Sequence, residues 1–270
     1  MALLFTPLKM GAQTLPNRIC VPPMCCCLAR EGVGSDELIA HYEKLAASGA
    51  GLVVIEATAV RADGRITTRC LGLYNDEQER FFKRLLKACR AVAPAETKFF
   101  LQLSHCGRKG SRKDPKTGHG TLLPEEGGFA LMAPSAVAYT PHAPMPREMT
   151  EADIDRMLQA FEAAAHRAAR VGFDGIQIHA AHGYLVHQFL SPVTNRRTDN
   201  WGGSLQNRQR FALEVVKAVQ RGAPELDVMV RLSACDWMQN GADEEQALSL
   251  ACALAALNIC ACLLYTSPSP

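Results

Sequence analysis

Residues 150–185 read TEADIDRMLQAFEAAAHRAARVGFDGIQIHAAHGYL and join a helical pattern to a strand and a polar turn. Apolar residues recur with the helical period between Thr150, a typical N-cap residue, and Gly172, a typical residue for the end of a helix. The apolar run Gly175–Ile178 then predicts a strand that is buried on both faces. A helix followed at once by a buried strand is typical of parallel α/β folds.

The same alternation extends through the chain in both directions. Each strand pattern is a short apolar run, which indicates burial in a parallel sheet. The predicted strands cover Ile19–Val21, Leu52–Ile55, Phe99–Leu103, Gly175–Ile178, Val228–Leu232 and a sixth segment at Ile259–Leu264. The predicted helices cover Asp36–Ser48, Asp76–Ala93, Glu151–Val171, Ser204–Arg221 and Asp243–Leu257. Strands alternating with helices predict either a doubly wound sheet or a (β/α)8 barrel.

Two observations favour an α/β fold of the (β/α)8 TIM-barrel type. Polar residues stand just past the strand ends, where such a barrel has its catalytic face; they are Cys25, Glu56, His105, His179 and Asp236. No Gly-x-Gly-x-x-Gly motif follows the first strand, so the usual signal of the dinucleotide-binding fold is missing. A short N-terminal hairpin predicted over Phe5–Asn17 is placed to close the bottom of the barrel.

The predicted barrel is incomplete. About six strands are present, whereas a closed barrel needs eight, so about two strand–helix units are absent. We therefore expect one partial barrel domain over residues 1–264, followed by an unstructured or artefactual tail over residues 265–270. Open strand edges expose unpaired backbone groups, so we expect the barrel to be of reduced stability. The long segment Cys106–Glu148 has no clear periodicity and is predicted to be a functional or mobile loop.

The composition is that of an ordinary globular protein. The formal net charge of +2 is too balanced to favour a nucleic acid or an anionic membrane surface as the partner. No apolar run reaches the roughly 18 residues of a membrane span, and the N-terminus has no signal-peptide pattern, so we expect a cytoplasmic protein. Eleven cysteines are an odd number in such a chain, which argues against a disulfide framework.

The densest group of reactive side chains is His179-Ala-Ala-His182-Gly-Tyr184, at the end of the fourth predicted strand. Two histidines three residues apart at a strand end can bind a metal, donate hydrogen bonds to an oxyanion, or satisfy each other in a polar core. Zinc normally needs a third ligand, for which the candidates are Glu56, His105 and Asp236. The nearby tyrosine favours proton transfer beside a pair that stabilises an anion.

Several further motifs, in their order and spacing, resemble the Old Yellow Enzyme family over nearly the whole chain. Because a cysteine follows Pro-Met, the chain resembles the bacterial subgroup of NADPH dehydrogenases rather than the yeast-like subgroup. The matching blocks are Pro16-Asn-Arg-Ile19, Pro22-Pro-Met-Cys25, Glu56-Ala57, Gln102–Lys109, His179–Tyr184, Phe189–Pro192, Asn195–Asp199, Trp201–Ser204, Asn207-Arg208 and Val230–Ser233.

The resemblance implies FMN bound without a covalent link across the mouth of the barrel, with NADPH or NADH as the hydride donor. It implies the reduction of the activated C=C bond of a small enone or enal. His179 and His182 are expected to hydrogen-bond the carbonyl oxygen of the substrate, where negative charge develops. Tyr184 is expected to deliver a proton to the α-carbon. The family resemblance implies no metal ion; a homo-oligomer is possible.

The resemblance also implies which residues contact the flavin. Arg231 is expected beside the pyrimidine edge, where its permanent charge stabilises the anionic reduced ring, and Gln102 offers a donor and an acceptor to the same edge. Cys25 is expected to adjust the flavin potential. Packing and backbone contacts are expected from Pro22, Pro23, Met24 and Ala57.

This sequence departs from the subgroup at Cys27, a substrate-binding position where the subgroup often has tyrosine. The departure predicts a changed substrate preference and a wider pocket. Three alternatives stay open at this point: a relative of the dienoyl-CoA reductase type with an iron–sulfur site and further domains, a zinc hydrolase using the two histidines, and an inactive fragment of the flavoenzyme. Because phosphate sites in these barrels are commonly built after strands seven and eight, we expect weak FMN binding.

Overall fold

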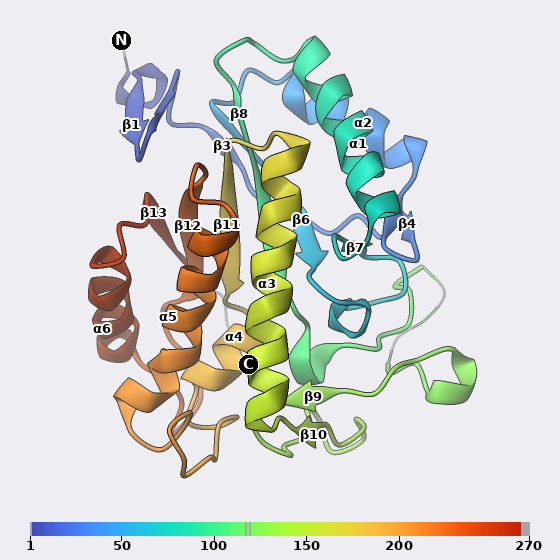
Figure 1. Ribbon diagram of the computed structural model, residues 1–270, viewed down its shortest axis with the longest axis vertical. Helices are drawn as coiled ribbons and strands as arrows, with labels where there is room; N and C mark the ends of the chain where they lie inside the picture. Colours follow the sequence, from blue (N-terminus) through green and yellow to red (C-terminus); the bar gives the residue numbers. More distant parts are fainter. Residues whose placement is uncertain (1, 117, 119, 266–270) are drawn as a thin grey trace.

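The computed structural model describes residues 2–116, 118 and 120–265. A parallel sheet crosses the centre of the molecule (Figure 1), and its strands stand in the order β3, β6, β8, β11, β12, β13. Their bounds are β3 (Cys20–Val21), β6 (Leu52–Ala59), β8 (Lys98–Ser104), β11 (Gly175–Ala180), β12 (Asp227–Ser233) and β13 (Ala261–Tyr265). Of the predicted tail over 265–270, Tyr265 ends the last strand and the other residues lie outside the described part.

The order of the strands in the sheet is their order along the chain. A doubly wound sheet reverses its direction at a switch point, whereas a barrel winds in one direction from strand to strand. Within the described residues, β3 and β13 form the two edges of this main sheet. The prediction of an α/β fold with an incomplete (β/α)8 barrel of six strands is therefore confirmed.

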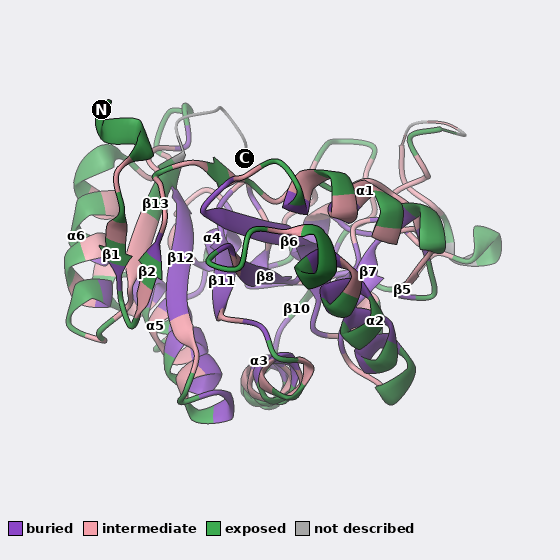
Figure 2. Cartoon of the chain, turned by 90° about the horizontal axis from the view of Figure 1, so that it is seen from above, coloured by how far each residue is buried: buried purple, intermediate pink, exposed green. Residues whose placement is uncertain are grey.

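The long helices pack on the outer side of the sheet. Figure 2 shows α6, α5, α3 and α2 following one another around this side of the curved strands. The bounds are α1 (Asp36–Ala46), α2 (Asp76–Val92), α3 (Glu151–Val171), α4 (Leu185–Leu190), α5 (Leu205–Gly222) and α6 (Glu244–Ala255). No helix in the described ranges is both long and apolar enough to cross a lipid bilayer.

Side-chain capping explains where five of these helices begin. In each case a polar side chain at the N-cap accepts a hydrogen bond from a backbone N–H of the first turn, which satisfies one of the orphan donors of the helix. At the start of α3, Thr150 and Asp153 form a reciprocal capping box, and Gly172 ends that helix at a φ of 98°. The other capping residues are Ser35, Asn75, Ser204 and Asp243.

Alternate residues of each strand face opposite sides of the sheet. On β8, Phe99, Leu101 and Leu103 join the large cluster between sheet and helices. Phe100 faces the inner side and joins a second, smaller cluster. The sheet is therefore buried on both faces, as its continuous apolar runs predict.

The N-terminal hairpin, β1 (Leu8–Met10) and β2 (Gln13–Leu15), covers the end of the inner side where the strands begin (Figure 1). The first residue of β12, Asp227, accepts hydrogen bonds from the backbone N–H groups at the hairpin turn, at 3.0 to 3.2 Å. The inner cluster that the hairpin completes consists of Met10, Leu15, Leu52, Val54, Phe100 and Met229. The prediction that this hairpin closes the bottom of the barrel is confirmed.

Three details differ from the sequence-based expectation. β6 runs four residues beyond Ile55, so Glu56 lies inside the strand rather than past its end. An irregularity after Ile55 shifts the register but lets β6 continue to pair with β8 and with the short β7 (Leu71–Gly72). His179 likewise lies inside β11, because its pairing with β12 extends to Ala180. The helix α4 was not expected.

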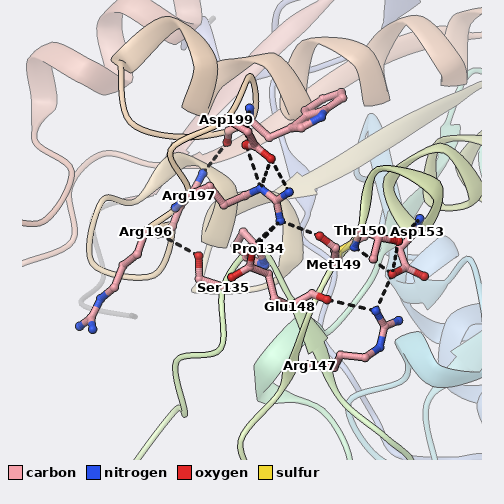
Figure 3. A network of polar contacts seen from close by, with 12 residues as sticks. Pro134, Ser135, Arg147, Glu148, Met149, Thr150, Asp153, Arg196, Arg197 and Asp199 are labelled. Atoms are coloured by element: carbon pink, nitrogen blue, oxygen red, sulfur yellow. Dashed lines mark hydrogen bonds and ion pairs between the residues drawn. The ribbon is translucent and has the colours of Figure 1, made fainter.

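The long segment after β8 returns to the mouth of the barrel and is fixed there by Arg197 (Figure 3). This buried guanidinium donates to the carbonyls of Pro134 and Met149, at 3.0 and 2.6 Å, and pairs with Asp199 at 2.5 Å. The described part of the segment is therefore anchored rather than detached. The short elements of this segment are the strands β9 (Met132–Ala133) and β10 (Arg147–Glu148) and the 3-10 turns Gly107–Lys109 and Pro124–Glu126. The short elements before β8 are β4 (Ala29–Arg30), β5 (Val33–Gly34) and the 3-10 turns Leu3–Phe5 and Ala62–Gly64.

Candidate active site

Inner side chains form rows that cross neighbouring strands. Gln102 of β8, Gln177 of β11 and Met229 of β12 are register partners. Gln102 Nε2 donates to Gln177 Oε1 at 2.6 Å, and Gln177 Nε2 donates to the Met229 sulfur at 3.5 Å. In the next inward-facing row toward the mouth, His179 is the register partner of Arg231. The structure thus brings three predicted site residues, Gln102, His179 and Arg231, onto one wall.

The two histidines contact each other directly. His182 Nδ1 lies 3.3 Å from His179 Nε2, and the rings meet edge to face with centroids 5.0 Å apart. The backbone N–H of Ala181 donates to His179 Nδ1 at 3.4 Å, which leaves the His179 proton on Nε2, directed at His182. The tautomers assigned from this pattern place the His182 proton on Nε2.

The surroundings keep both imidazoles neutral. Burial, followed by the neighbouring His182 and Arg231, holds the pKa of His179 well below its usual value. Burial, followed by the positive charges of Arg231 and Lys109, lowers the pKa of His182 to about 4. At neutral pH the pair therefore consists of neutral hydrogen-bond donors, which can bind a carbonyl oxygen without giving up a proton to it.

Tyr184 lies against the same pair. Its ring centroid is 5.0 Å from that of His179, and the Lys109 ammonium lies 5.3 Å from the tyrosine ring. Burial raises the pKa of Tyr184, so its hydroxyl keeps its proton. Lys109 Nζ also donates to the carbonyl of His182 at 2.8 Å, and burial lowers the pKa of Lys109 to about 8.

The segment after β3 contributes an open apolar surface to the mouth. Pro22, Met24 and Cys25 are exposed, and Met24 keeps 52% of its surface accessible. Such exposure is unusual for methionine beside a barrel core, where a covering molecule would remove this surface from water. Pro23 and Cys27 of the same segment are half-buried, while the predicted flavin neighbour Ala57 lies buried in β6.

The three candidate third ligands for zinc have other partners. Glu56 accepts from the backbone N–H of Cys26 at 3.1 Å, His105 accepts from Gly107 at 3.1 Å, and Asp236 accepts from Ser191 at 2.5 Å. Across the described ranges no group of three His, Cys, Asp or Glu side chains has the arrangement of a metal site. The histidine pair therefore lacks the third ligand that the hydrolase alternative requires.

Sequence reasoning missed three side chains around this site. Lys109 and Gln177 touch predicted residues directly, while His187 acts one contact further out. Gln177 was detectable, because it is a polar residue in the middle of the apolar strand pattern over 175–178. Lys109 gave no such signal, because the His182 carbonyl to which it donates lies 73 positions away in the sequence. His187 belongs to the short helix α4, which the sequence did not predict.

Glu56 gives a testable pH dependence. Burial raises its pKa from 4.5 to about 7, despite the hydrogen bonds that it accepts. Between these two values the folded chain holds a proton that the unfolded chain has lost, so stability should fall as pH rises, by about 3 kcal/mol in total. Glu56→Gln should remove this fall. Urea denaturation of the unaltered chain and the variant, at about pH 5 and about pH 8, measures the fall in stability of each. An equal fall in the two proteins would show that Glu56 of the folded chain is ionised at both pH values.

Comparisons with known proteins agree with this geometry. A family model described as the NADH:flavin oxidoreductase / NADH oxidase family matches residues 3–262. An NADPH dehydrogenase of Listeria welshimeri is 41% identical over 253 residues, which cover 93% of this chain and 69% of that protein. The NADH:flavin oxidoreductase FG08077 of Gibberella zeae is 42% identical over 240 residues, 87% of this chain and 57% of that protein. The chain thus spans little more than half the length of the second of these relatives.

Solved structures show the same relationship. Morphinone reductase superposes with a TM-score of 0.82 at 31% identity, over 98% of this chain and 72% of that one. The Old Yellow Enzyme homologue from Zymomonas mobilis superposes with a TM-score of 0.83 at 30% identity, over 99% of this chain and 77% of that one. A structure of morphinone reductase in complex with tetrahydroNAD is also similar, with a TM-score of 0.81 at 31% identity, over 97% of this chain and 73% of that one.

Proposed function

This chain belongs to the NADH:flavin oxidoreductase / NADH oxidase family, that of Old Yellow Enzyme, and we propose that it serves the reduction of activated C=C bonds in α,β-unsaturated carbonyl compounds. FMN, with NADPH or NADH as the hydride donor, is the cofactor pair of this family. The observation that carries the proposal is the neutral histidine pair beside a protonated tyrosine at the barrel mouth. Which alkene is reduced depends on the pocket around Cys27.

The residues of this chain fit FMN. The exposed apolar segment Pro22–Cys25 offers a surface for a flat ring system, and burying it would be favourable. Gln102 and Arg231 supply an amide and a permanent cation on the adjoining wall. In addition, the hydroxyl of Ser104 at the end of β8 is buried without a hydrogen-bond partner among the described residues. An unsatisfied buried hydroxyl is costly unless a bound group completes it.

Each side chain then has a definite task. The chemistry that FMN supplies when bound is hydride transfer from NADPH or NADH to the β-carbon of the alkene. His182 donates from Nε2 to the carbonyl oxygen, where negative charge develops. His179 donates to the same oxygen once its own contact with His182 opens, because that contact occupies its only proton. Tyr184 delivers a proton to the α-carbon.

The proposal is tested by the visible absorbance of the purified chain. We expect a yellow, saturable complex when FMN is in excess, which NADPH bleaches under anaerobic conditions and 2-cyclohexenone restores. Because β13 is an open edge with exposed Leu263 and Leu264, we also expect most of the FMN to be lost on desalting. If the absorbance spectrum of FMN does not change when the protein is added, the result would support the alternative of an inactive fragment. Bleaching without reoxidation by the enone would contradict the proposed substrate class.

A further inference from the structure

Glu56 carries a buried carboxyl group that the proposed reaction does not use. The residue lies in β6 with 1% of its surface exposed, next to the predicted flavin neighbour Ala57. Its carboxyl oxygens accept hydrogen bonds from uncharged groups, and no ion pair in the described part of the chain includes it. A buried carboxyl without a cationic partner is costly to the fold. Its presence therefore indicates a task other than stability.

The backbone of β6 is irregular at this residue. The register with β8 shifts between Ile55 and Thr58, where three steps along β6 match two steps along β8. The extra residue makes Glu56 and Ala57 a β-bulge. Bulges are frequent beside active sites, where they redirect a side chain. Here the carboxyl of Glu56 has two neighbours, one on a helix and one on the segment that follows β3.

Tyr42 of α1 holds Glu56 from the helix side. The backbone N–H of Glu56 donates to the Tyr42 hydroxyl oxygen at 2.8 Å, and this hydroxyl donates to one carboxyl oxygen of Glu56 at 3.4 Å. Tyr42 is itself buried, as a member of the cluster between sheet and helices. A side chain that is supported by a packed neighbour and a second hydrogen bond is held in one position.

The other carboxyl oxygen of Glu56 holds the segment Pro22–Cys25 through the residue that follows it. Glu56 Oε2 accepts from the backbone N–H of Cys26 at 3.1 Å. β3 pairs with β6 over two residues and ends at Val21, and the two prolines that follow have no N–H to donate. Among the described residues, the bond from Cys26 is therefore the one that ties this segment to β6.

We propose that Glu56 is a positioning residue for FMN, which fixes the segment Pro22–Cys25 in the form that receives the flavin ring. This inference rests on the proposed function, in which the exposed segment is the surface offered to the ring. Without an acceptor at position 56, the Cys26 N–H would turn to water and the segment would be free to move. FMN would then have to order the segment as it binds, which lowers the affinity.

The test compares Glu56→Gln with Glu56→Met. Glutamine keeps an oxygen that can accept from the Cys26 N–H, whereas methionine has a similar length and lacks this oxygen. Titration of FMN fluorescence should show a dissociation constant that rises at least about 10-fold in Glu56→Met, because a buried donor loses its acceptor. The rise in Glu56→Gln should stay below about 3-fold. Without FMN, backbone hydrogen exchange at Cys26 should be faster in Glu56→Met and unchanged in Glu56→Gln.

Glu79→Met is the matched control. Glu79 is also a buried carboxylate, but it pairs with Lys83 of α2 and with Arg167 and Arg170 of α3. Its loss should lower the free energy of unfolding and leave both FMN binding and exchange at Cys26 unchanged.

Two results would overturn the role of Glu56. One is FMN binding by Glu56→Met as tight as that of the unaltered chain, and the other is an equal loss of affinity in Glu56→Met and Glu56→Gln. If the unaltered chain binds no FMN, the proposed function fails. Unchanged hydrogen exchange in Glu56→Met would instead show that Glu56 does not hold the segment.

Discussion

Replacing Tyr184 with phenylalanine should slow enone reduction by about 100- to 10,000-fold, the range over which a positioned general acid accelerates a reaction. The hydroxyl keeps its proton because burial raises the pKa of Tyr184. Phenylalanine preserves the ring contact with His179, at 5.0 Å between centroids, and removes only the hydroxyl that carries the proton. The measurement is the rate of NADPH oxidation with 2-cyclohexenone as the acceptor, in excess FMN.

Two controls separate proton transfer from damage to the site. With oxygen as the acceptor no α-carbon is protonated, so the Tyr184→Phe variant should consume NADPH at the rate of the unaltered chain. Tyr139→Phe removes the same hydroxyl from a ring that also lies near Lys109, at 4.9 Å, and should change enone reduction only a few-fold. An equal loss with both acceptors would indicate a disturbed site. A loss of less than about 10-fold with the enone would assign the proton to another donor.

The sequence was sufficient to predict the strand and helix order, because each element carries its own signal. Strands buried on both faces leave uninterrupted apolar runs, and α3 lies between Thr150 and Gly172 as the capping pattern predicts. The sequence was also sufficient to predict that the polar residues near the strand ends lie together, since parallel strands bring their carboxyl ends to one edge. The shared wall of Gln102, His179 and Arg231 therefore follows from the order of the strands and the alternation of side chains along them.

Features that depend on distant partners could not be predicted. α4 has six residues and no side-chain cap at its start, so its formation rests on burial of its apolar residues rather than on local sequence. The hydrogen bond between the two histidines depends on side-chain directions that spacing alone does not give.

The network around Asp236 also depends on residues that are far apart in the sequence. It is the basis of the second prediction with a large expected effect. Ser191 Oγ donates to one carboxylate oxygen at 2.5 Å, Ala242 N–H donates to it at 2.7 Å, and His187 Nε2 lies 2.9 Å from the other. His187 Nδ1 in turn accepts from the backbone N–H of Gly183 at 2.7 Å. The carboxylate thus supports, through His187, the turn that carries His182 and Tyr184, the histidine and tyrosine of the proposed reaction. Its position was detectable in the sequence, but its role was not.

Asp236→Ala should lower the free energy of unfolding by about 3–5 kcal/mol, because several buried donors lose their acceptor at once. Burial alone would raise the pKa of Asp236, but the hydrogen bonds from His187, Ser191 and Ala242 outweigh it and lower the pKa. The stabilisation is therefore complete above the usual aspartate value of 3.8 and is lost as pH falls through the lower folded-state pKa. Urea denaturation at neutral pH measures the full difference.

Asp155→Ala is the matched control, since it deletes the same group from an exposed position on α3 and should change stability by less than about 0.5 kcal/mol. Similar losses in the two variants would mean that the buried network contributes nothing beyond a surface carboxylate. Because His187 anchors Gly183, Asp236→Ala should also weaken the placement of Tyr184, so enone reduction should fall while the enone-independent reaction with oxygen persists. Loss of stability with unchanged enone reduction would confine Asp236 to folding and detach it from the site.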